Sequence, residues 1–360
     1  MSRRVFCKVL LVVVAIFSVL VLSGVLSAQG RSEDGLQRAI AAQQRHTDVL
    51  MAKPGVVGTA VGLNDNGQHT VMVLLERPGV AGIPKKLDDV SVEVVVTGKF
   101  YALPKPPKPP RPDKPGGGKE INPKKRFDRP VPIGVSTGNE NECSAGTIAC
   151  RVTKGGNVYA LSNNHVYALE NKASDYESNR VLQPGRPDAK PPCAVKSKDV
   201  IGTLDDFEPI VDFFDCYDPP DNPATNTIDA AIALSSESDL GDATPSNGYG
   251  RPKSTTVPAV MGQAVQKYGR TSSLTKGSIV LVNAELYVGY SSGCARFVDQ
   301  IIVEGVGTFI QRGDSGSLLV TDPSRNPVGL LFAGNASGTL AVANQIDLVL
   351  DRFGVTIDGE

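Results

Sequence analysis

Short apolar runs separated by glycine, proline, asparagine and aspartate recur from about residue 130 to the end of the chain. Runs of this length, rich in valine, isoleucine and threonine and bounded by turn residues, are typical of antiparallel β-strands. Strands are predicted, in order, at Gly146–Val152, Val158–Leu161, Val200–Leu204, Ile228–Leu234, Ala264–Tyr268, Ser278–Leu286, Phe297–Val303, Ser317–Val320, Val328–Phe332 and Thr339–Ala343. Only Asn344–Phe353 has its apolar residues at helical spacing. The pattern therefore predicts a mainly β barrel or sandwich that ends in a helix.

The chain before residue 104 has a different pattern, in which a helical stretch precedes the strands. A helix is expected over residues 34–52, followed by strands at Val56–Leu63, Thr70–Glu76 and Val90–Leu103. The turn Asn64-Asp65-Asn66-Gly67 between the first two strands is a strong hairpin signal. Residues 34–103 are therefore predicted to form a small α+β domain. Its two histidines, His46 and His69, are expected to be surface or packing residues.

Residues 1–28 have the composition of an export signal. Cationic residues precede an apolar core that runs over about residues 9–22, and small residues lead up to Ala28. This order predicts cleavage after Ala28 and a secreted or periplasmic protein. The alternative is an uncleaved N-terminal anchor over residues 9–26, because the apolar stretch approaches the length that spans a membrane.

Residues 104–129 are rich in proline, lysine and glycine, and they predict a linker to a β domain at residues 130–360. Prolines at this density impose an extended geometry, and the charges keep the segment solvated. A stiff spacer is favoured over a site for a proline-recognising partner or a processing protease.

The charge and cysteine content exclude some classes of function. A net charge of -1 gives no broad attraction to nucleic acid or to an anionic membrane. Cys7 belongs to the export signal, and five cysteines remain: Cys143, Cys150, Cys193, Cys216 and Cys294. An odd number leaves at least one unpaired or bonded to another chain. Pairs Cys143–Cys150 and Cys193–Cys216 with Cys294 left over are one option, but spacing does not fix the pairing. No C-x-x-C pair occurs and histidines are few, so neither a metal site nor a cofactor is expected.

A candidate nucleophile lies in Gly313-Asp314-Ser315-Gly316, where a serine between glycines opens an apolar run. A serine hydroxyl is a weak nucleophile that needs a base to take its proton and an acid to orient that base. His165 is the one histidine after residue 130, and it leaves a predicted strand for a turn. Asp229 stands at the head of an apolar strand, where a buried carboxylate needs a partner such as an imidazole N–H. We therefore predict Ser315, His165 and Asp229 as nucleophile, base and acid.

The order His165, Asp229, Ser315 separates the main arrangements of serine hydrolases. The α/β-hydrolases place the histidine last and need a glycine two residues after the serine, where this chain has Ser317. Subtilisin-like enzymes place the acid before the histidine, so the chymotrypsin order is the one that fits.

Three segments carry a resemblance to a known family: Ser162-Asn163-Asn164-His165-Val166, Ile228-Asp229-Ala230-Ala231-Ile232-Ala233-Leu234 and Gly313-Asp314-Ser315-Gly316. They resemble the catalytic motifs of trypsin/chymotrypsin-like serine peptidases, and the resemblance covers roughly residues 130–360. It implies a mainly β fold, a double six-stranded β-barrel with a C-terminal helix and the site between the barrels. It also implies the roles of the site residues, with His165 as general base, Asp229 as its orienter, Ser315 as nucleophile, and the N–H groups of Gly313 and Ser315 as the oxyanion hole.

A second local match concerns the loop that carries the serine. Lys267–Gly277 is similar to a segment of bacterial secreted members of the family, in which an arginine pairs with the acid beside the catalytic serine. The match predicts an Arg270–Asp314 ion pair that holds the oxyanion loop.

Two positions depart from the family pattern. Phe309, six residues before Ser315, stands where trypsin-like specificity needs an acid, so cleavage after lysine or arginine is not expected. Phe332 or Ala333 stands where a serine near the catalytic acid is typical. This second departure concerns the strand on which a substrate docks.

Together these features predict an exported serine endopeptidase that acts on protein or peptide substrates through an acyl-enzyme on Ser315. Residues 34–103 are a candidate pro-region, because several secreted bacterial members of the family carry one. One alternative is a protease-fold binding or scaffold protein that cleaves weakly or not at all. Another is a protein that processes only its own linker. No nucleic-acid partner and no membrane contact beyond the N-terminal anchor are expected, and the oligomeric state stays open.

Overall fold

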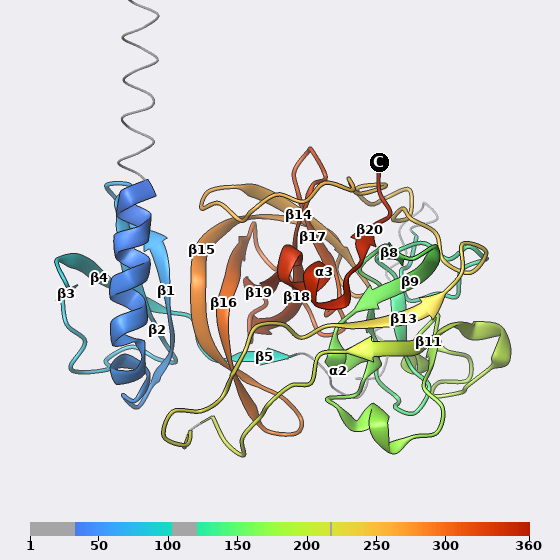
Figure 1. Cartoon of the computed structure of the whole chain (residues 1–360), viewed down its shortest axis with the longest axis horizontal. Coiled ribbons are helices and arrows are strands. Elements are labelled where there is room, and N and C mark those ends of the chain that lie inside the picture. The colour runs from blue at the N-terminus through green and yellow to red at the C-terminus, as the bar shows by residue number, and fades with distance from the viewer. Residues whose placement is uncertain (1–32, 103–120, 217) are drawn as a thin grey trace, which may run out of the picture.

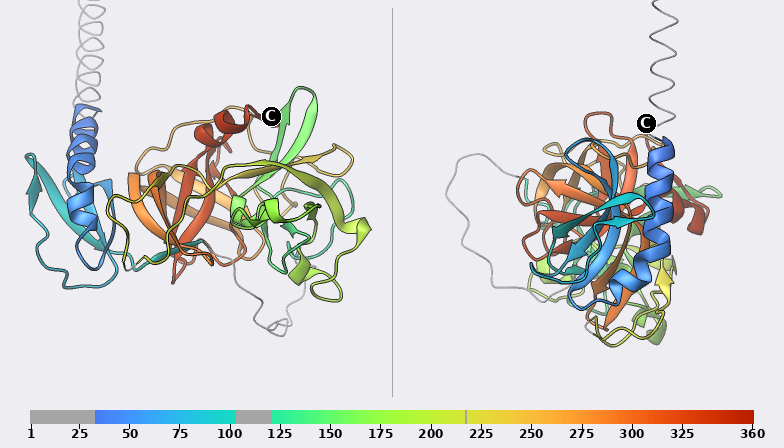
Figure 2. Two further views of the ribbon diagram at one scale, coloured as in Figure 1. Left: turned by 60° about the horizontal axis from the view of Figure 1, so that its bottom comes forward. Right: turned by 90° about the vertical axis from the view of Figure 1, so that its left-hand side faces the viewer.

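The computed structural model describes residues 33–102, 121–216 and 218–360. The predicted export signal and residues 104–120 of the predicted linker lie outside this part of the chain. An N-terminal unit lies at one end of the molecule, a ring of strands in the middle and a second β body at the other end (Figure 1). The left view of Figure 2 keeps this order, and the right view shows the N-terminal helix beside its strands.

The N-terminal unit begins with a helix over residues 33–51, which is followed by β1 (Val56–Leu63), β2 (His69–Leu75), β3 (Lys86–Leu87) and β4 (Val90–Val96). The predicted helix and hairpin are confirmed, since β1 and β2 pair antiparallel around the predicted turn. β1 also pairs antiparallel with β15 (Ser273–Gly289), with Gly58 opposite Leu286. The N-terminal unit and the ring therefore share one continuous sheet.

The predicted third strand at Val90–Leu103 is in fact broken into two. β4 runs parallel to β2, whereas β5 (Phe100–Ala102) leaves the unit and pairs with β15 and with β18 (Pro327–Asn335). Gly98 between them has a φ of 71°, a conformation that glycine adopts without the strain of a side chain. This turn directs the chain from the N-terminal unit into the centre of the molecule, where Figure 1 shows β5.

Six strands close the middle body into a ring: β14 (Ala264–Gly269), β15, β16 (Cys294–Gly305), β19 (Leu340–Gln345), β18 and β17 (Leu318–Thr321). Each pairs with the next, and β17 pairs with β14 to complete the circuit. Its inward side chains form an apolar core that includes Val265, Ile279, Leu319 and Leu331. The short β12 (Thr225–Asn226) adds to β16 in parallel.

The other body is an open eight-stranded sheet in the order β20-β8-β9-β13-β11-β10-β6-β7. Its strands are β6 (Ser136–Asn139), β7 (Gly146–Thr147), β8 (Arg151–Lys154), β9 (Asn157–Ser162), β10 (Arg180–Leu182), β11 (Val200–Phe207), β13 (Ala231–Ser235) and β20 (Thr356–Ile357). Its helices are α2 (Asn164–Tyr167) and three 3-10 turns at Lys172–Asp175, Arg186–Asp188 and Ser197–Asp199. The terminal strands β7 and β20 have two residues each and do not pair with one another, so this body is not a closed barrel.

The predicted C-terminal helix is confirmed as α3 (Ile346–Phe353). Ile346, Val349 and Phe353 lie on one face and enter the core of the eight-stranded sheet. The fold is therefore mainly β with two β bodies and a C-terminal helix, preceded by a small α+β unit, as the sequence predicted.

The end of the predicted linker contacts the eight-stranded sheet. Arg126 Nε lies 2.7 Å from Asp199 Oδ1, and the backbone N–H of Phe127 donates to Gln183 Oε1 at 3.0 Å. Residues 121–129 are therefore held by hydrogen bonds to the β body that follows them. The predicted domain boundaries stay predictions.

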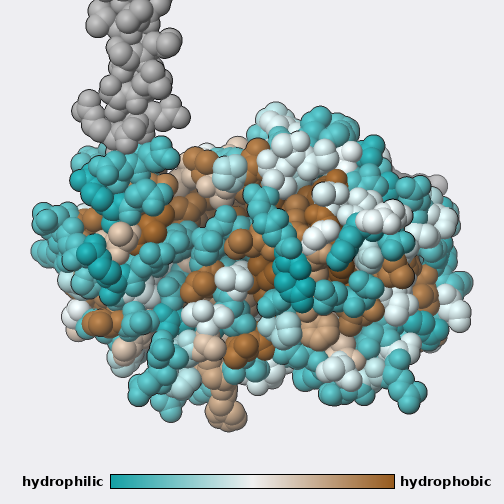
Figure 3. Space-filling model, in the orientation of Figure 1, coloured by the Kyte–Doolittle hydropathy of each residue, from teal (hydrophilic) through white to brown (hydrophobic). Residues whose placement is uncertain are grey.

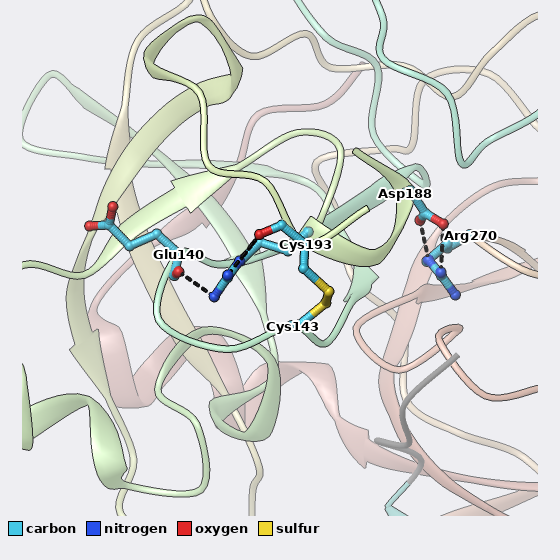
Figure 4. Close-up of a disulfide and its surroundings, with 6 residues drawn as sticks. Glu140, Cys143, Asp188, Cys193 and Arg270 are labelled. Atoms are coloured by element: carbon cyan, nitrogen blue, oxygen red, sulfur yellow. Dashed lines mark hydrogen bonds and ion pairs between the residues drawn. A yellow bond between two sulfur atoms is a disulfide. The ribbon is translucent and has the colours of Figure 1, made fainter. Parts of the chain in front are cut away.

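The disulfide option considered from the sequence is wrong. Cys143 pairs with Cys193 (Figure 4). Cys216 pairs with Cys294, while Cys150 is free and buried. Cys150 belongs to the apolar core of the eight-stranded sheet, so its thiol cannot reach Cys143 despite the short spacing. The fold, and not the chain separation, determines which sulfurs meet.

The surface mixes apolar and polar residues on the face shown in Figure 3. Across the described ranges, no helix has both the length and the apolar character to cross a membrane.

Candidate active site

The predicted base and acid are brought together by two neighbouring strands of the eight-stranded sheet. His165 lies on α2 directly after β9, and Asp229 lies just before β13, which pairs with β9. His165 Nδ1 lies 2.5 Å from Asp229 Oδ2, and the backbone N–H of His165 donates to Oδ1 at 3.2 Å. Asn163 Nδ2 also donates to the Asp229 carbonyl oxygen at 2.7 Å. These contacts fix the imidazole ring and leave Nε2 as its free nitrogen.

The predicted nucleophile comes from the ring. Ser315 precedes β17, and its carbonyl oxygen accepts a 2.8 Å hydrogen bond from the backbone N–H of Thr147. A Cβ atom on Gly146 would lie 2.5 Å from the Val166 side chain and 2.8 Å from the Ser315 carbonyl oxygen, so β7 packs closely against both α2 and the serine loop. The Ser315 hydroxyl lies 3.4 Å from the Phe332 carbonyl oxygen.

The link between base and nucleophile is not formed in this structure. His165 Nε2 is buried and has no hydrogen-bond partner within residues 33–102, 121–216 and 218–360. His165 is 2% exposed and Ser315 is 1% exposed, so solvent does not reach either group.

The backbone before Ser315 is held by two threonine side chains. Gly313 has a φ of 95°, and its carbonyl oxygen accepts a 2.8 Å hydrogen bond from Thr147 Oγ1. Thr271 Oγ1 donates to the Arg312 carbonyl oxygen at 2.7 Å. The N–H groups of Gly313 and Ser315 find no acceptor among the residues that the structure describes. Two free N–H groups beside a hydroxyl are the donors that a developing oxyanion requires.

The predicted Arg270–Asp314 ion pair is wrong, because Arg270 binds another carboxylate. Its Nε and Nη2 donate to Asp188 Oδ2 and Oδ1 at 2.6 and 2.8 Å (Figure 4). The cation at Asp314 is Lys267, whose Nζ lies 3.2 Å from Oδ2 in a fully buried pair. Val265 and Lys267 are two residues apart, so they lie on the same face of β14, and both are buried. Arg270 follows the end of that strand and reaches the other β body.

Asp314 is held by more than this one cation. Its carboxylate accepts backbone N–H groups from Thr271, Ser272 and Gln311 and the Ser272 hydroxyl, at 2.5 to 3.1 Å. Burial alone would raise the pKa of Asp314, but Lys267 and these donors lower it below the ordinary range. Burial lowers the pKa of Lys267. The Lys267–Gly277 segment therefore does hold the serine loop, as predicted. It does so through backbone N–H groups and the Lys267 side chain, and not through the Arg270 side chain.

Sequence analysis did not find Tyr290, which is the remaining partner of the acid. Its hydroxyl donates to Asp229 Oδ2 at 2.9 Å. Its ring meets the His165 ring edge-on at 6.1 Å and stacks on Phe297. Burial, followed by the charge of Asp229, raises the pKa of Tyr290 well above its ordinary value, so the phenol stays a donor. Tyr290 directly follows β15 and supplies a hydroxyl to the Asp229 carboxylate from outside the eight-stranded sheet.

Replacing Tyr290 by phenylalanine is expected to lower kcat about tenfold with KM little changed, because a hydrogen bond to a charged group contributes about 1.5–3 kcal/mol. Turnover of a peptide anilide measures this. Tyr287→Phe is the matched control, since Tyr287 lies three residues before Tyr290 and its ring packs edge-on against Phe213. Equal kcat values for Tyr290→Phe and the unmodified chain would show that Asp229 does not need the phenol.

Comparisons with known proteins find one family model and several solved structures. Residues 252–355 match the family model described as the Nal1 C-terminal domain, which is less than half of the chain. No curated protein matches the sequence.

Solved structures of serine proteases are similar in fold. A glutamic acid-specific serine protease is 19% identical, with a TM-score of 0.43 over 63% of this chain and 100% of that one. Protease A of Thermobifida fusca is 16% identical, with a TM-score of 0.43 over 64% and 99%. The chymotrypsin of Cellulomonas bogoriensis is 17% identical, with a TM-score of 0.41 over 65% and 100%. The chain thus resembles bacterial chymotrypsin-like serine proteases, as its motifs predicted. At such scores the likeness identifies no functional residue, and those come from the geometry of this chain.

Proposed function

We propose that this protein is an exported serine endopeptidase in which Ser315 forms an acyl-enzyme with peptide substrates. The observation that carries the proposal is the free, buried Nε2 of His165, whose Nδ1 is held by Asp229. A buried polar atom without a partner is costly, and such atoms in folded proteins commonly have a functional reason. Here Gly146 packs closely against both the serine loop and the helix that carries His165, and Nε2 is the atom available to take the serine proton.

The reaction follows from these roles. As Ser315 Oγ bonds to the substrate carbonyl carbon, its proton passes to His165 Nε2, and Asp229 stabilises the imidazolium. The carbonyl oxygen becomes an oxyanion held by the N–H groups of Gly313 and Ser315. The C–N bond then breaks, the amine leaves with the proton from Nε2, and an ester remains on Ser315. Water attacks this ester with Nε2 as its base, which releases the acid and returns the proton to Ser315.

Export and the candidate pro-region belong to the same proposal. Residues 1–28 are proposed as a cleaved export signal, and the two disulfides are compatible with an oxidising compartment outside the cytosol. Residues 34–103 are proposed as a pro-region, and their sheet pairing with β15 supports a role in folding or masking the ring. The mass of the mature protein distinguishes a retained unit from a removed one.

A fluorophosphonate label tests the peptidase proposal against a scaffold that does not cleave. The chain with β5 displaced by Tyr101→Pro is expected to take up the label at Ser315, and the same chain carrying Ser315→Ala is expected to take up none. Ser317→Ala is the matched control, because that neighbouring hydroxyl donates to the Asp314 carbonyl oxygen and should leave labelling intact. If the folded Tyr101→Pro protein remains unlabelled, the result would contradict the proposal.

A further inference from the structure

The edge of β18 beside Ser315 is occupied by a segment of the chain's own N-terminal part. β5 pairs antiparallel with β18, with Ala102 opposite Ala333, Tyr101 opposite Gly334 and Phe100 opposite Asn335. These positions on β18 follow directly after Phe332, the residue whose carbonyl oxygen contacts the Ser315 hydroxyl.

This edge would otherwise be open. On that side of β18, β17 pairs only as far as Leu330, whereas β19 pairs with Ala333 and Gly334 on the opposite side. An open strand edge next to a nucleophile is where an extended peptide adds a strand through main-chain hydrogen bonds. β5 makes this addition within the same chain.

We propose that β5 is an internal substrate mimic that fills the substrate groove, so that the full chain inhibits itself, and that its side chains report the peptide class the groove accepts. The proposal rests on the proposed peptidase function for its chemistry, but the occupancy itself does not depend on catalysis. The nearly complete burial of His165 and Ser315 is the state expected when the groove is filled.

The side chains of β5 define three subsites. Phe100 is 1% exposed and packs in a cluster with Phe297 and Phe332, which makes an apolar pocket for an aromatic residue. Ala102 is buried in the same cluster and leaves room only for a small residue. Tyr101 between them is 38% exposed, so its position tolerates many side chains. The groove therefore takes an extended peptide with an aromatic residue, an unrestricted residue and a small residue in that order.

The next residue of such a peptide lies opposite Phe332 and carries the carbonyl that Ser315 attacks. An apolar side chain suits it, because Phe309 and Ile310 are buried, and a Cβ atom on Gly334 would lie 2.6 Å from Ile310. The chain's own sequence after Ala102 continues with Leu103, which lies outside the described residues. Acetyl-Phe-Tyr-Ala-Leu is thus the probe sequence.

β5 is tethered at its N-terminal side, which raises its effective concentration at the groove. Asn335 Nδ2 donates to the Thr97 carbonyl oxygen at 3.2 Å. Arg296 on β16 binds Glu285 on β15 and Asp48 on the N-terminal helix. A free peptide therefore competes poorly until this attachment is weakened.

The test uses the full chain carrying Ser315→Ala, so that binding is measured without catalysis. Fluorescein-labelled Phe-Tyr-Ala-Leu is titrated and its anisotropy followed. Tyr101→Pro, which removes a backbone N–H from β5 at a half-exposed side chain, should bind the peptide at least tenfold more tightly than the parent. Tyr101→Ala keeps that N–H and should bind the peptide as weakly as the parent does. The peptide Asp-Tyr-Trp-Leu, with a charge and a bulky residue at the two restricted positions, should bind at least tenfold more weakly.

Equal peptide affinity for Tyr101→Pro and Tyr101→Ala would overturn the proposal. A second measurement does not depend on whether a Tyr101 variant folds. A large excess of Phe-Tyr-Ala-Leu added to the parent chain should speed amide hydrogen exchange of residues 100–102. Unchanged exchange rates would also overturn the proposal. With Ser315 restored, Tyr101→Pro should hydrolyse acetyl-Phe-Tyr-Ala-Leu 4-nitroanilide at least tenfold faster than the unmodified chain. Tighter binding without hydrolysis would uphold the occupied groove and remove the peptidase function.

Discussion

Replacing Asp229 by asparagine is expected to lower kcat about ten-thousand-fold while the protein stays folded. Asp229 accepts from His165 Nδ1 and from the Tyr290 hydroxyl, and it is fully buried. An amide can present N–H to the ring, so Nδ1 becomes the acceptor and Nε2 carries the proton. A protonated Nε2 cannot take the proton of Ser315, and the first step is blocked.

Turnover of the Phe-Tyr-Ala-Leu anilide, measured in the Tyr101→Pro background, checks this expectation. Asp205→Asn is the matched control, because Asp205 lies exposed on β11 of the same sheet. It should retain the parent kcat. A loss of less than about tenfold in Asp229→Asn would mean that another group orients His165.

Replacing Lys267 by methionine is expected to lower the free energy of unfolding by about 3–5 kcal/mol, because it leaves Asp314 buried without its cation. Both partners are fully buried, and methionine keeps much of the lysine's apolar volume. The serine loop should lose order at the same time, since Asp314 holds it through Gln311. Urea unfolding of the parent and the variant measures the stability difference.

The pH dependence of this difference has a defined sign. Asp314 has a pKa below its ordinary value in the parent, so its contribution is present above the ordinary carboxyl pKa of about 4 and is lost as the pH falls through the folded value. In Lys267→Met, a proton can neutralise the uncompensated carboxylate, so the variant should approach the parent as the pH falls from 7 to 4.

Two further variants complete the stability test. Lys276→Met removes an exposed lysine that pairs with Asp322, and it should cost less than about 1 kcal/mol. Adding Asp314→Asn to Lys267→Met should cost less than the sum of the two single changes. A pH-independent difference between Lys267→Met and the parent would mean that lost packing, and not the buried charge, is responsible.

Local sequence signals predicted much of the fold and the candidate residues of the site. The Asn-Gly turn predicted the hairpin of β1 and β2, and helical spacing predicted α3. His165 was selected because no other histidine follows residue 130, and the order of the motifs selected its acid and its nucleophile. These features depend on residues close together in the chain, or on their order alone.

The features that sequence analysis missed depend on contacts between distant segments. Tyr290 follows a long strand with no motif around it, and only the closure of the ring brings its hydroxyl to Asp229. The disulfide pairs join residues 50 and 78 positions apart, for which spacing gives no rule. The burial of Lys267 could have been predicted from the sequence, because it lies two residues after Val265 and therefore on the same face of β14. A lysine on an apolar face needs an acid, but only the fold shows that this acid is Asp314.

The pairing of β1 with β15 has a consequence for any form of the protein without its N-terminal unit. Gly58 and Thr59 face Leu286 and Glu285 across this pair, so removing them would leave those backbone groups of β15 without neighbours. Val57 and Met72 would be lost from the apolar cluster around Leu286 as well. An unprotected apolar strand edge invites pairing with another chain. A shortened protein would therefore be prone to dimerise or aggregate through β15 unless another strand covered it.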